Sequence, residues 1–487
     1  MKRSSLARWL PLGLAACAGV SQAVTLNPRG LGQALVYPYY TVNKGQDTLV
    51  SLVNGSDFGK LVAVRFLEGY NGQTVLEFGV FLAAHETWTA SLSQTSDAGG
   101  AAVHTADHSC TYPAIGSAGQ PFLTSRFNDG GPQGATRTRE GSFEAIAMGD
   151  IVPGSATDAR ILRIQGIEPG GTLPGDCPLT AESYIATLAD LVTPTSGLFG
   201  SGSIVNVGQG TLFAYNADAL SGFTDIPFSS PTADFGSVSL MAANSSESVM
   251  SARAHVFAQL HAADDGFPFA IDFPNGIDAV SAVFMADTIH NDYLVAAGLG
   301  ANTDWIVTFP TKHFYVDRAA NPSGRFYPFA QPFDAPGKSE VTFGAKIYDQ
   351  EEGFTTVGGP CGFCPPPLPL PSLPYQVNAI SFMAQPGAPL VSGVLGSNLT
   401  TNLAPHASAG TVEFDLASID YGDRAHVLSG YGVDNPNDSV ELYGLPVTGF
   451  MVYNIVNANA QAGSLANYGG LFRHAKRTLY GRASFSR

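Results

Sequence analysis

Charged residues are scarce in this 487-residue chain, at 13% of the total, while apolar residues make up 45%. Low charge with high apolar content excludes an intrinsically disordered chain, which needs the opposite balance. Lys and Arg number 24 against 40 Asp and Glu, for a formal net charge of −16. A surplus of negative charge repels phosphate backbones, so we expect no nucleic-acid partner.

Long apolar runs and familiar catalytic signatures are also missing. After the first 23 residues, no apolar run is long enough to cross a bilayer as a helix, so we expect no transmembrane segment. The sequence contains no Gly-x-Ser-x-Gly elbow, no Walker A loop, no dinucleotide-binding fingerprint and no His-Glu-x-x-His. These absences favour a non-enzymatic protein without a cofactor.

Glycine (55), proline (32) and phenylalanine (30) are plentiful, while long tracts of helix-forming residues are lacking. This balance favours many short strands joined by turns. The pattern is clearest from Ala34 to Leu92, where runs of alternating apolar and polar residues are joined by Asn-Gly turns at 54–55 and 71–72. We predict an all-β protein of two or three immunoglobulin-like β-sandwich domains, with long loops and few short helices.

Chain length bounds the number of domains, because 487 residues exceed what a single core usually supports. We expect a signal peptide at 1–23 and three β-rich segments after it. These are an N-terminal β-sandwich domain at 24–105, a central domain with long loops at 106–335, and a C-terminal domain at 336–487 that carries a proline-rich loop at 358–374.

Four local patterns give further expectations. Ala181 to Leu191 has helical spacing, Gly200 to Tyr215 predicts a hairpin, and Ser281 to Ala286 predicts a strand. The tail from Arg473 to Arg487 holds five basic residues, which offset an otherwise acidic molecule, and we expect it to be a flexible end.

The N-terminus predicts export. Three basic residues flank or precede a short apolar core, and Ser21-Gln22-Ala23 presents small residues at a cleavage point. The run from Leu14 to Cys17 also resembles a lipoprotein box, in which Cys17 would be lipidated, but the well-formed later site favours cleavage after Ala23. Removing these residues takes three basic and no acidic side chains, so the net charge becomes −19. We expect a periplasmic, cell-surface or extracellular protein.

Four cysteines remain after the signal peptide: Cys110, Cys177, Cys361 and Cys364. An even number in an exported chain suggests two disulfides, and of the three pairings we favour Cys110–Cys177 with Cys361–Cys364. The Cys-x-x-Cys pair is also compatible with a redox motif. Three prolines follow Cys364 directly and cannot open the helix that such a motif needs, which favours a structural disulfide.

Four blocks of sequence together resemble a known family: NPRGLGQALVYPYYTVN (Asn27–Asn43), LVSLVN with VRFLEGYNG (Leu49–Gly72), GSGSIVNVGQGTLFAYNADAL (Gly200–Leu220) and TDWIVTFPTKHFY (Thr303–Tyr315). The family comprises exported, β-rich proteins of Gram-negative bacteria, mostly uncharacterised cell-surface proteins. The resemblance spans most of the chain after the signal peptide. It implies export and a related fold, and it brings no catalytic residues.

Two clusters have the composition of a metal site. His104 and His108, with Cys110 close by, have a zinc-ligand spacing if they lie on a helix, but the glycines and proline around them favour a loop with surface histidines. The turn from Asp434 to Glu441 is rich in oxygen ligands for calcium, yet it lacks the glycine and spacing of an EF-hand loop. A plain Asx turn is the alternative.

Two further clusters are relevant to carbohydrate. Three carboxylates end a predicted strand: Asp349, Glu351 and Glu352. A carboxylate pair can hydrolyse a glycoside, although sequence neighbours rarely face each other across a substrate and solvated charges are the simpler interpretation. Tyr37, Tyr39 and Tyr40 have the rings to stack on sugars, but strand tyrosines are more often packing residues.

These observations favour an exported, non-enzymatic cell-surface or extracellular protein that is structural or adhesive through protein or glycan contacts. The alternative is a secreted polysaccharide hydrolase that uses a carboxylate pair such as Asp349 and Glu351. A third hypothesis is a lipoprotein anchored through Cys17. Calcium is the one ion that we retain as a candidate ligand.

Overall fold

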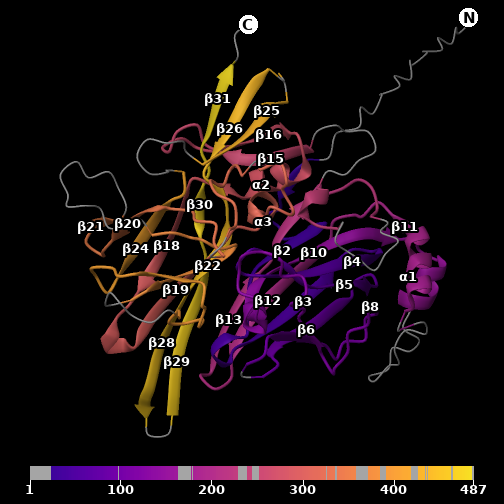
Figure 1. The fold of residues 1–487 in the computed structure, drawn as a ribbon, viewed down its shortest axis with the longest axis horizontal. Helices are drawn as coiled ribbons and strands as arrows, with labels where there is room; N and C mark the ends of the chain where they lie inside the picture. The colour runs from indigo at the N-terminus through magenta and orange to yellow at the C-terminus, as the bar shows by residue number, and fades with distance from the viewer. Residues whose placement is uncertain are drawn as a thin grey trace, which may run out of the picture.

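The computed structural model describes residues 23–96, 98–162, 177, 179–228, 238–243, 252–324, 326–334, 337–357, 371–383, 391–417, 426–433, 435, 437–461 and 464–484. In these residues the chain is predominantly β, with several sheets and few short helices (Figure 1), which confirms the predicted all-β class. The immunoglobulin-like topology stays a prediction. Cys17, Cys361, Cys364 and most of the proline-rich loop lie outside the described residues.

Sheet I is the largest, with 13 strands. In spatial order its strands are β31 (Tyr480–Ser484), β26 (Asp438–Tyr443), β25 (Val427–Gly432), β16 (Phe267–Phe273), β15 (Ala252–Ala258), β1 (Val24–Leu26), β14 (Asp218–Ser221), β2 (Ala34–Thr41), β10 (Glu140–Ile151), β4 (Gly59–Glu68), β5 (Thr74–Leu82) and β8 (Thr111–Tyr112), with β11 (Leu191–Val192) paired to β10.

Sheet II consists of β13 (Thr211–Asn216), β12 (Leu198–Asn206), β3 (Asp47–Asn54), β6 (Thr87–Gln94), β7 (Ala101–His104) and β9 (Gln120–Pro121). It packs face to face with the N-terminal part of sheet I around a shared aromatic core, in which the rings of Phe78 and Trp88 lie 5.6 Å apart. The predicted hairpin at 200–215 is formed by β12 and β13.

Sheets III and IV form a second face-to-face pair. Sheet III consists of β21 (Phe354–Val357), β20 (Gly344–Tyr348), β24 (Ala409–Asp415), β18 (Thr288–Leu294) and β30 (Ala475–Arg477). Sheet IV consists of β23 (Thr400–Leu403), β22 (Val377–Phe382), β19 (Ala301–Thr308), β28 (Thr448–Gln461) and β29 (Ser464–Arg473). The rings of Trp305 and Phe414 meet between them at 4.8 Å. A separate short pair joins β17 (Met285–Ala286) and β27 (Leu445–Pro446).

The two pairs of sheets are packed against each other. The face of sheet IV that points away from sheet III packs against sheets I and II. The ring of Phe450 contacts Tyr39 and Tyr215 there, and Thr308 Oγ1 donates to the Pro38 carbonyl at 2.7 Å. Strands also pair across the predicted domain boundaries: β10 lies between β2 and β4, and β16 pairs with β25. The boundaries at 105 and 335 therefore do not coincide with gaps between sheets.

Three α-helices are short: α1 (Ala181–Thr187), α2 (Gly276–Phe284) and α3 (Lys312–Val316). The helix predicted at 181–191 is present as α1, followed by a 3₁₀ turn at Leu188–Asp190. Of the strand predicted at 281–286, only Met285–Ala286 is a strand, as β17. Residues 281–284 belong to α2, which Asn275 caps by accepting the Asp278 backbone N–H at 2.9 Å. None of the helices in the described part of the chain is long and apolar enough to cross a membrane.

The flexible end predicted from Arg473 onwards is also wrong over the described residues. β30 pairs with β18, and β31 pairs with β26 along five residue pairs from Asp438↔Ser484 to Leu442↔Tyr480. The described part of the basic tail is therefore built into sheets, with Arg473 at the end of β29 in sheet IV, β30 in sheet III and β31 in sheet I.

Candidate functional site

The three tyrosines considered for sugar stacking are core residues. Tyr37, Tyr39 and Tyr40 are each 0% exposed, and each hydroxyl has an internal acceptor. The Tyr37 ring stacks on Phe143 with a centroid distance of 3.9 Å. Burial raises the pKa of all three phenols. No face of these rings is open to a ligand, so the sugar-stacking alternative is wrong.

The carboxylates at the end of β20 form a turn. Asp349 Oδ1 accepts the backbone N–H groups of Glu351 and Gly353, both at 2.8 Å, and Oδ2 lies 3.3 Å from His406 Nε2. The hydrogen bond from Glu351 is the main reason that the pKa of Asp349 is lowered, which is the wrong direction for a general acid. Glu352 continues the same turn with φ of +66°.

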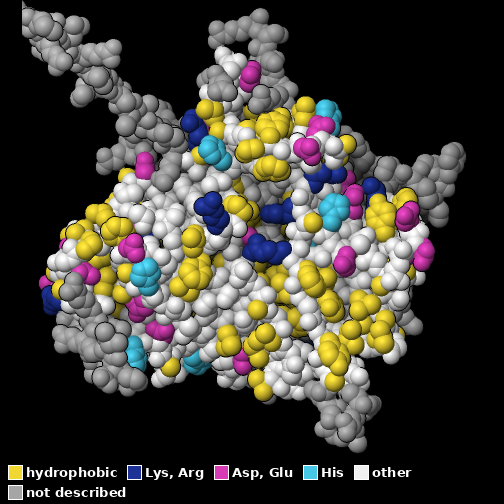
Figure 2. Space-filling model, turned by 180° about the vertical axis from the view of Figure 1, so that it is seen from behind, with side chains coloured by type: hydrophobic (Ala, Val, Ile, Leu, Met, Phe, Trp, Pro, Cys, Tyr) yellow, Lys and Arg dark blue, Asp and Glu magenta, His cyan; other side chains and the backbone are white. Residues whose placement is uncertain are grey.

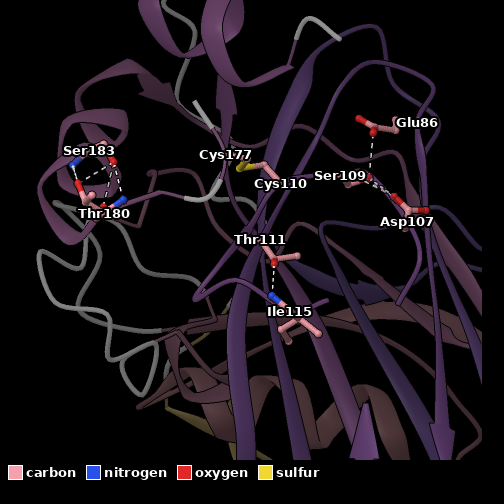
Figure 3. Close-up of a disulfide and its surroundings, with 9 residues drawn as sticks. All are labelled: Glu86, Asp107, Ser109, Cys110, Thr111, Ile115, Cys177, Thr180 and Ser183. Carbon is pink, nitrogen blue, oxygen red and sulfur yellow. Dashed lines mark hydrogen bonds between the residues drawn. A yellow bond between two sulfur atoms is a disulfide. The ribbon is translucent and has the colours of Figure 1, made fainter. Parts of the chain in front are cut away.

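The proposed zinc ligands are separated by the local structure. His104 ends β7, and His108 follows in an irregular loop rather than on a helix. Cys110 is joined to Cys177 in a disulfide with a Cα–Cα distance of 5.9 Å, the pairing favoured from the sequence (Figure 3). Because the sulfur of Cys110 is in a disulfide, it does not act as a thiolate ligand for zinc.

The candidate calcium turn connects β25 to β26. Asn435 Nδ2 donates to Asp438 Oδ1 at 2.9 Å, and the Asn437 backbone N–H donates to Asn435 Oδ1 at 3.1 Å, as in an Asx turn. Asp434 lies outside the described residues. The described residues contain no group of three or more His, Cys, Asp or Glu side chains placed to hold a metal ion.

A different site emerges on the face shown in Figure 2, where Lys and Arg side chains gather around a hollow, beside a group of hydrophobic side chains. Between β15, β18 and β30 lies a hollow of about 260 Å³, which we call the Phe257 hollow. The side chains that matter for its chemistry are Phe257, Gln259, His290, Lys476 and Arg477.

One wall of the Phe257 hollow combines an exposed ring with an amide. The Phe257 side chain is 65% exposed, although β15 otherwise directs apolar residues inward and polar residues outward. Gln259 follows on the same side, and its buried Oε1 has no hydrogen-bond partner among the described residues. Buried polar atoms are normally paired, so this amide oxygen is a candidate acceptor for a ligand donor, which would reach it when the Gln259 amide turns toward the hollow.

The opposite wall is cationic. Arg477 is held by Asp287 through Nε at 2.9 Å and Nη2 at 2.6 Å, and Lys476 Nζ donates to the Val447 carbonyl at 3.1 Å. Although the Lys476 side chain reaches solvent, protein atoms around its ammonium desolvate it, which lowers its pKa. Burial also lowers the pKa of His290, which favours the neutral ring.

Lys476 also lines a second, smaller cavity of about 60 Å³, which we call the Arg473 crevice. There Arg473 forms an ion pair with Asp218 and donates to the Asn216 carbonyl. Asp218, which is only 4% exposed, also accepts a hydrogen bond from Thr448. Lys476 thus lines both cavities.

A shallow furrow on the outer face of sheet II is larger, at about 400 Å³, and is less specific. It is lined by small hydroxyl side chains, with Leu49 and His104 beside them. The hydroxyl groups of Ser51 and Ser201 form a hydrogen bond of 2.9 Å with each other across the strands. The furrow brings together neither an exposed aromatic ring nor a cation, so the Phe257 hollow is the stronger candidate.

Sequence reasoning identified the basic tail but not its role, and it missed Phe257 and Gln259. A signal for Phe257 is present: Arg253 and His255 precede it on the outward face of β15, so it is the apolar exception in a polar row. Comparison of the chain with protein-family models, curated proteins and solved structures finds no match, so the chemistry of the site carries the functional argument.

Proposed function

We propose that this is an exported, non-enzymatic cell-surface or extracellular protein that adheres to glycans through the Phe257 hollow. The observation that carries this proposal is the combination of an exposed aromatic ring, an unpaired amide oxygen and two cations around one cavity. A sugar ring has an apolar C–H face that packs on an aromatic ring and hydroxyl groups that donate to an amide oxygen.

The size of the cavity supports a small ligand unit. At about 260 Å³ the hollow is slightly below the roughly 300–1,000 Å³ typical of pockets for drug-sized molecules, so it suits one ring of a longer chain. Adhesion through single rings is strengthened when many copies of a protein and many repeats of a polymer meet at a surface.

A glycan panel tests the proposal with the purified protein and its Phe257→Ala and Gln259→Ala variants. Phe354→Ala is the matched control, because Phe354 is 57% exposed and lies on β21, away from the hollow. We expect retention of at least one polysaccharide, weakened tenfold or more by Phe257→Ala and within twofold of wild type for Phe354→Ala. Failure to retain any glycan, or equal binding by Phe257→Ala, would overturn the proposal.

The same panel addresses the hydrolase alternative when the release of new reducing ends is measured. Asp349 closes a turn with its own neighbours, so a pair formed with Glu351 does not flank a substrate from two sides. We expect no release of reducing ends. Activity that disappears in Glu351→Gln or Glu352→Gln would restore the hydrolase hypothesis.

A further inference from the structure

We propose that the glycan is acidic, and that its anionic group binds to Lys476, which lines both the Phe257 hollow and the Arg473 crevice. This inference rests on the proposed function and adds the chemical class of the ligand. It assigns the sugar ring to the larger cavity and the charged substituent to the smaller one.

The first support is the position of Lys476. Its side chain lines both cavities, so a ligand that fills either one contacts it. Its ammonium donates to the Val447 carbonyl at 3.1 Å and forms no ion pair with a described residue. The Phe284 ring lies beside it, with its centroid 5.6 Å from Nζ, and no hydrogen bond to a described residue uses the other two N–H donors.

The second support is the arrangement of the neighbouring arginines. Asp287 holds Arg477 by Nε and Nη2, and Asp218 holds Arg473 by Nη1. Each aspartate is at most 4% exposed, so it holds its arginine from the protein interior. Arg473 also donates from Nη2 to the Asn216 carbonyl, and its side chain is 47% exposed, against 28% for Arg477. Planar guanidinium donors suit carboxylates and phosphates.

The third support is the number of donors gathered at one place. Arg473, Lys476 and Arg477 line the two cavities, and the carboxylates around them are Asp218 and Asp287 together with Glu413 and Asp415 of β24. An anion would therefore be held by directed N–H donors rather than by an excess of positive charge. The crevice of about 60 Å³ has room for a carboxylate or phosphate group and not for a sugar ring.

Binding to polygalacturonate and to neutral dextran tests this inference, with Lys476→Met as the variant because methionine keeps most of the apolar stem. Arg318→Gln is the matched control: it removes one positive charge from a side chain that is 64% exposed and pairs with Asp334 elsewhere on the surface. Thermal unfolding of each variant establishes that it is folded. Inorganic phosphate is added as a competitor to distinguish the two anionic groups.

We expect the protein to bind polygalacturonate at least tenfold more tightly than dextran. Lys476→Met should weaken polygalacturonate binding at least tenfold, and Arg318→Gln should change it less than twofold. Competition by millimolar phosphate would show that the anion subsite accepts phosphate as well as carboxylate, and no competition would show that it selects carboxylate. Equal binding of polygalacturonate by Lys476→Met, or equal binding of the two polymers, would overturn the inference. Such a result would leave the proposed function standing if Phe257→Ala still weakens binding, whereas failure to bind any glycan would overturn both.

Discussion

Arg477 donates to a single carboxylate oxygen of Asp287 from two of its nitrogens, at 2.9 and 2.6 Å. The other oxygen of Asp287 is buried and has no hydrogen-bond partner among the described residues. Burial raises the pKa of Asp287, and Arg477 opposes that rise. The ion pair thus fixes β30 against the segment that enters β18, under the Phe257 hollow.

Arg477→Gln should destabilise the protein by about 3–5 kcal/mol, because it leaves a buried carboxylate without its counter-charge. Urea unfolding monitored by tryptophan fluorescence measures the change. The double variant Arg477→Gln with Asp287→Asn should recover most of the loss. A single variant as stable as wild type would show that the pair contributes nothing to the fold.

Loss of the disulfide should lower stability by about 2–4 kcal/mol, because it closes a loop between residues 67 apart in sequence. The variant is Cys110→Ala with Cys177→Ala, and the measurement is urea unfolding under oxidising conditions. Wild-type protein treated with a reductant should lose a similar amount. The double variant keeps the predicted Cys361–Cys364 bond, which closes a much shorter loop, so the reductant should cost it less stability than it costs the wild type.

Stability should fall as the pH drops from about 6.5 to about 4, in part through His474. Burial lowers the pKa of His474 to about 4, with Lys476 acting in the same direction, while its Nε2 lies 2.9 Å from the Ile306 carbonyl. The unfolded chain binds the proton near pH 6.5, so between these two values it gains protons that the folded chain does not. The loss amounts to about 3 kcal/mol at most.

Urea unfolding at pH 7 and pH 4.5 measures this dependence, and His474→Gln should reduce it, since glutamine donates to the same carbonyl without titrating. His313 and His426 are also held neutral by burial and act in the same direction, so a smaller dependence remains in the variant. An unchanged difference between the two pH values in His474→Gln would contradict the assignment.

Processing of the N-terminus should leave Val24 as the first residue. Mass spectrometry of the exported protein measures this directly, and Ala23→Arg should block the cleavage because a large charged residue does not fit a small-residue site. Cys17→Ala should not change the fractionation of the protein between membrane and soluble samples. Release of the protein from membranes by Cys17→Ala would instead favour the lipoprotein hypothesis.

Local patterns in the sequence predicted the strands well where alternation was strong, as in β4, β5 and β6. The half-burial that alternation implies is present in β6, whereas β4 and most of β5 are buried on both faces because a second layer of the protein covers them. The run Ser281–Ala286 is apolar at every position but the first, so neither a helical nor a strand period can be recognised in it. The Asn275 cap that begins α2 lies outside that window. The Phe257 hollow could not be predicted, since it joins β15 to β30, whose contact depends on the packing of whole sheets.

β1 contains three residues, yet it alone connects β14 to β15 in sheet I. Thr25 pairs antiparallel with Ser221 and parallel with His255. The first described strand therefore pairs with residues that are synthesised about 200 positions later. Closing such distant contacts has a high entropic cost, and proteins rich in them fold slowly. A chain of this design stays incompletely folded through most of its synthesis, which is the state in which a polypeptide can be threaded through a translocation channel.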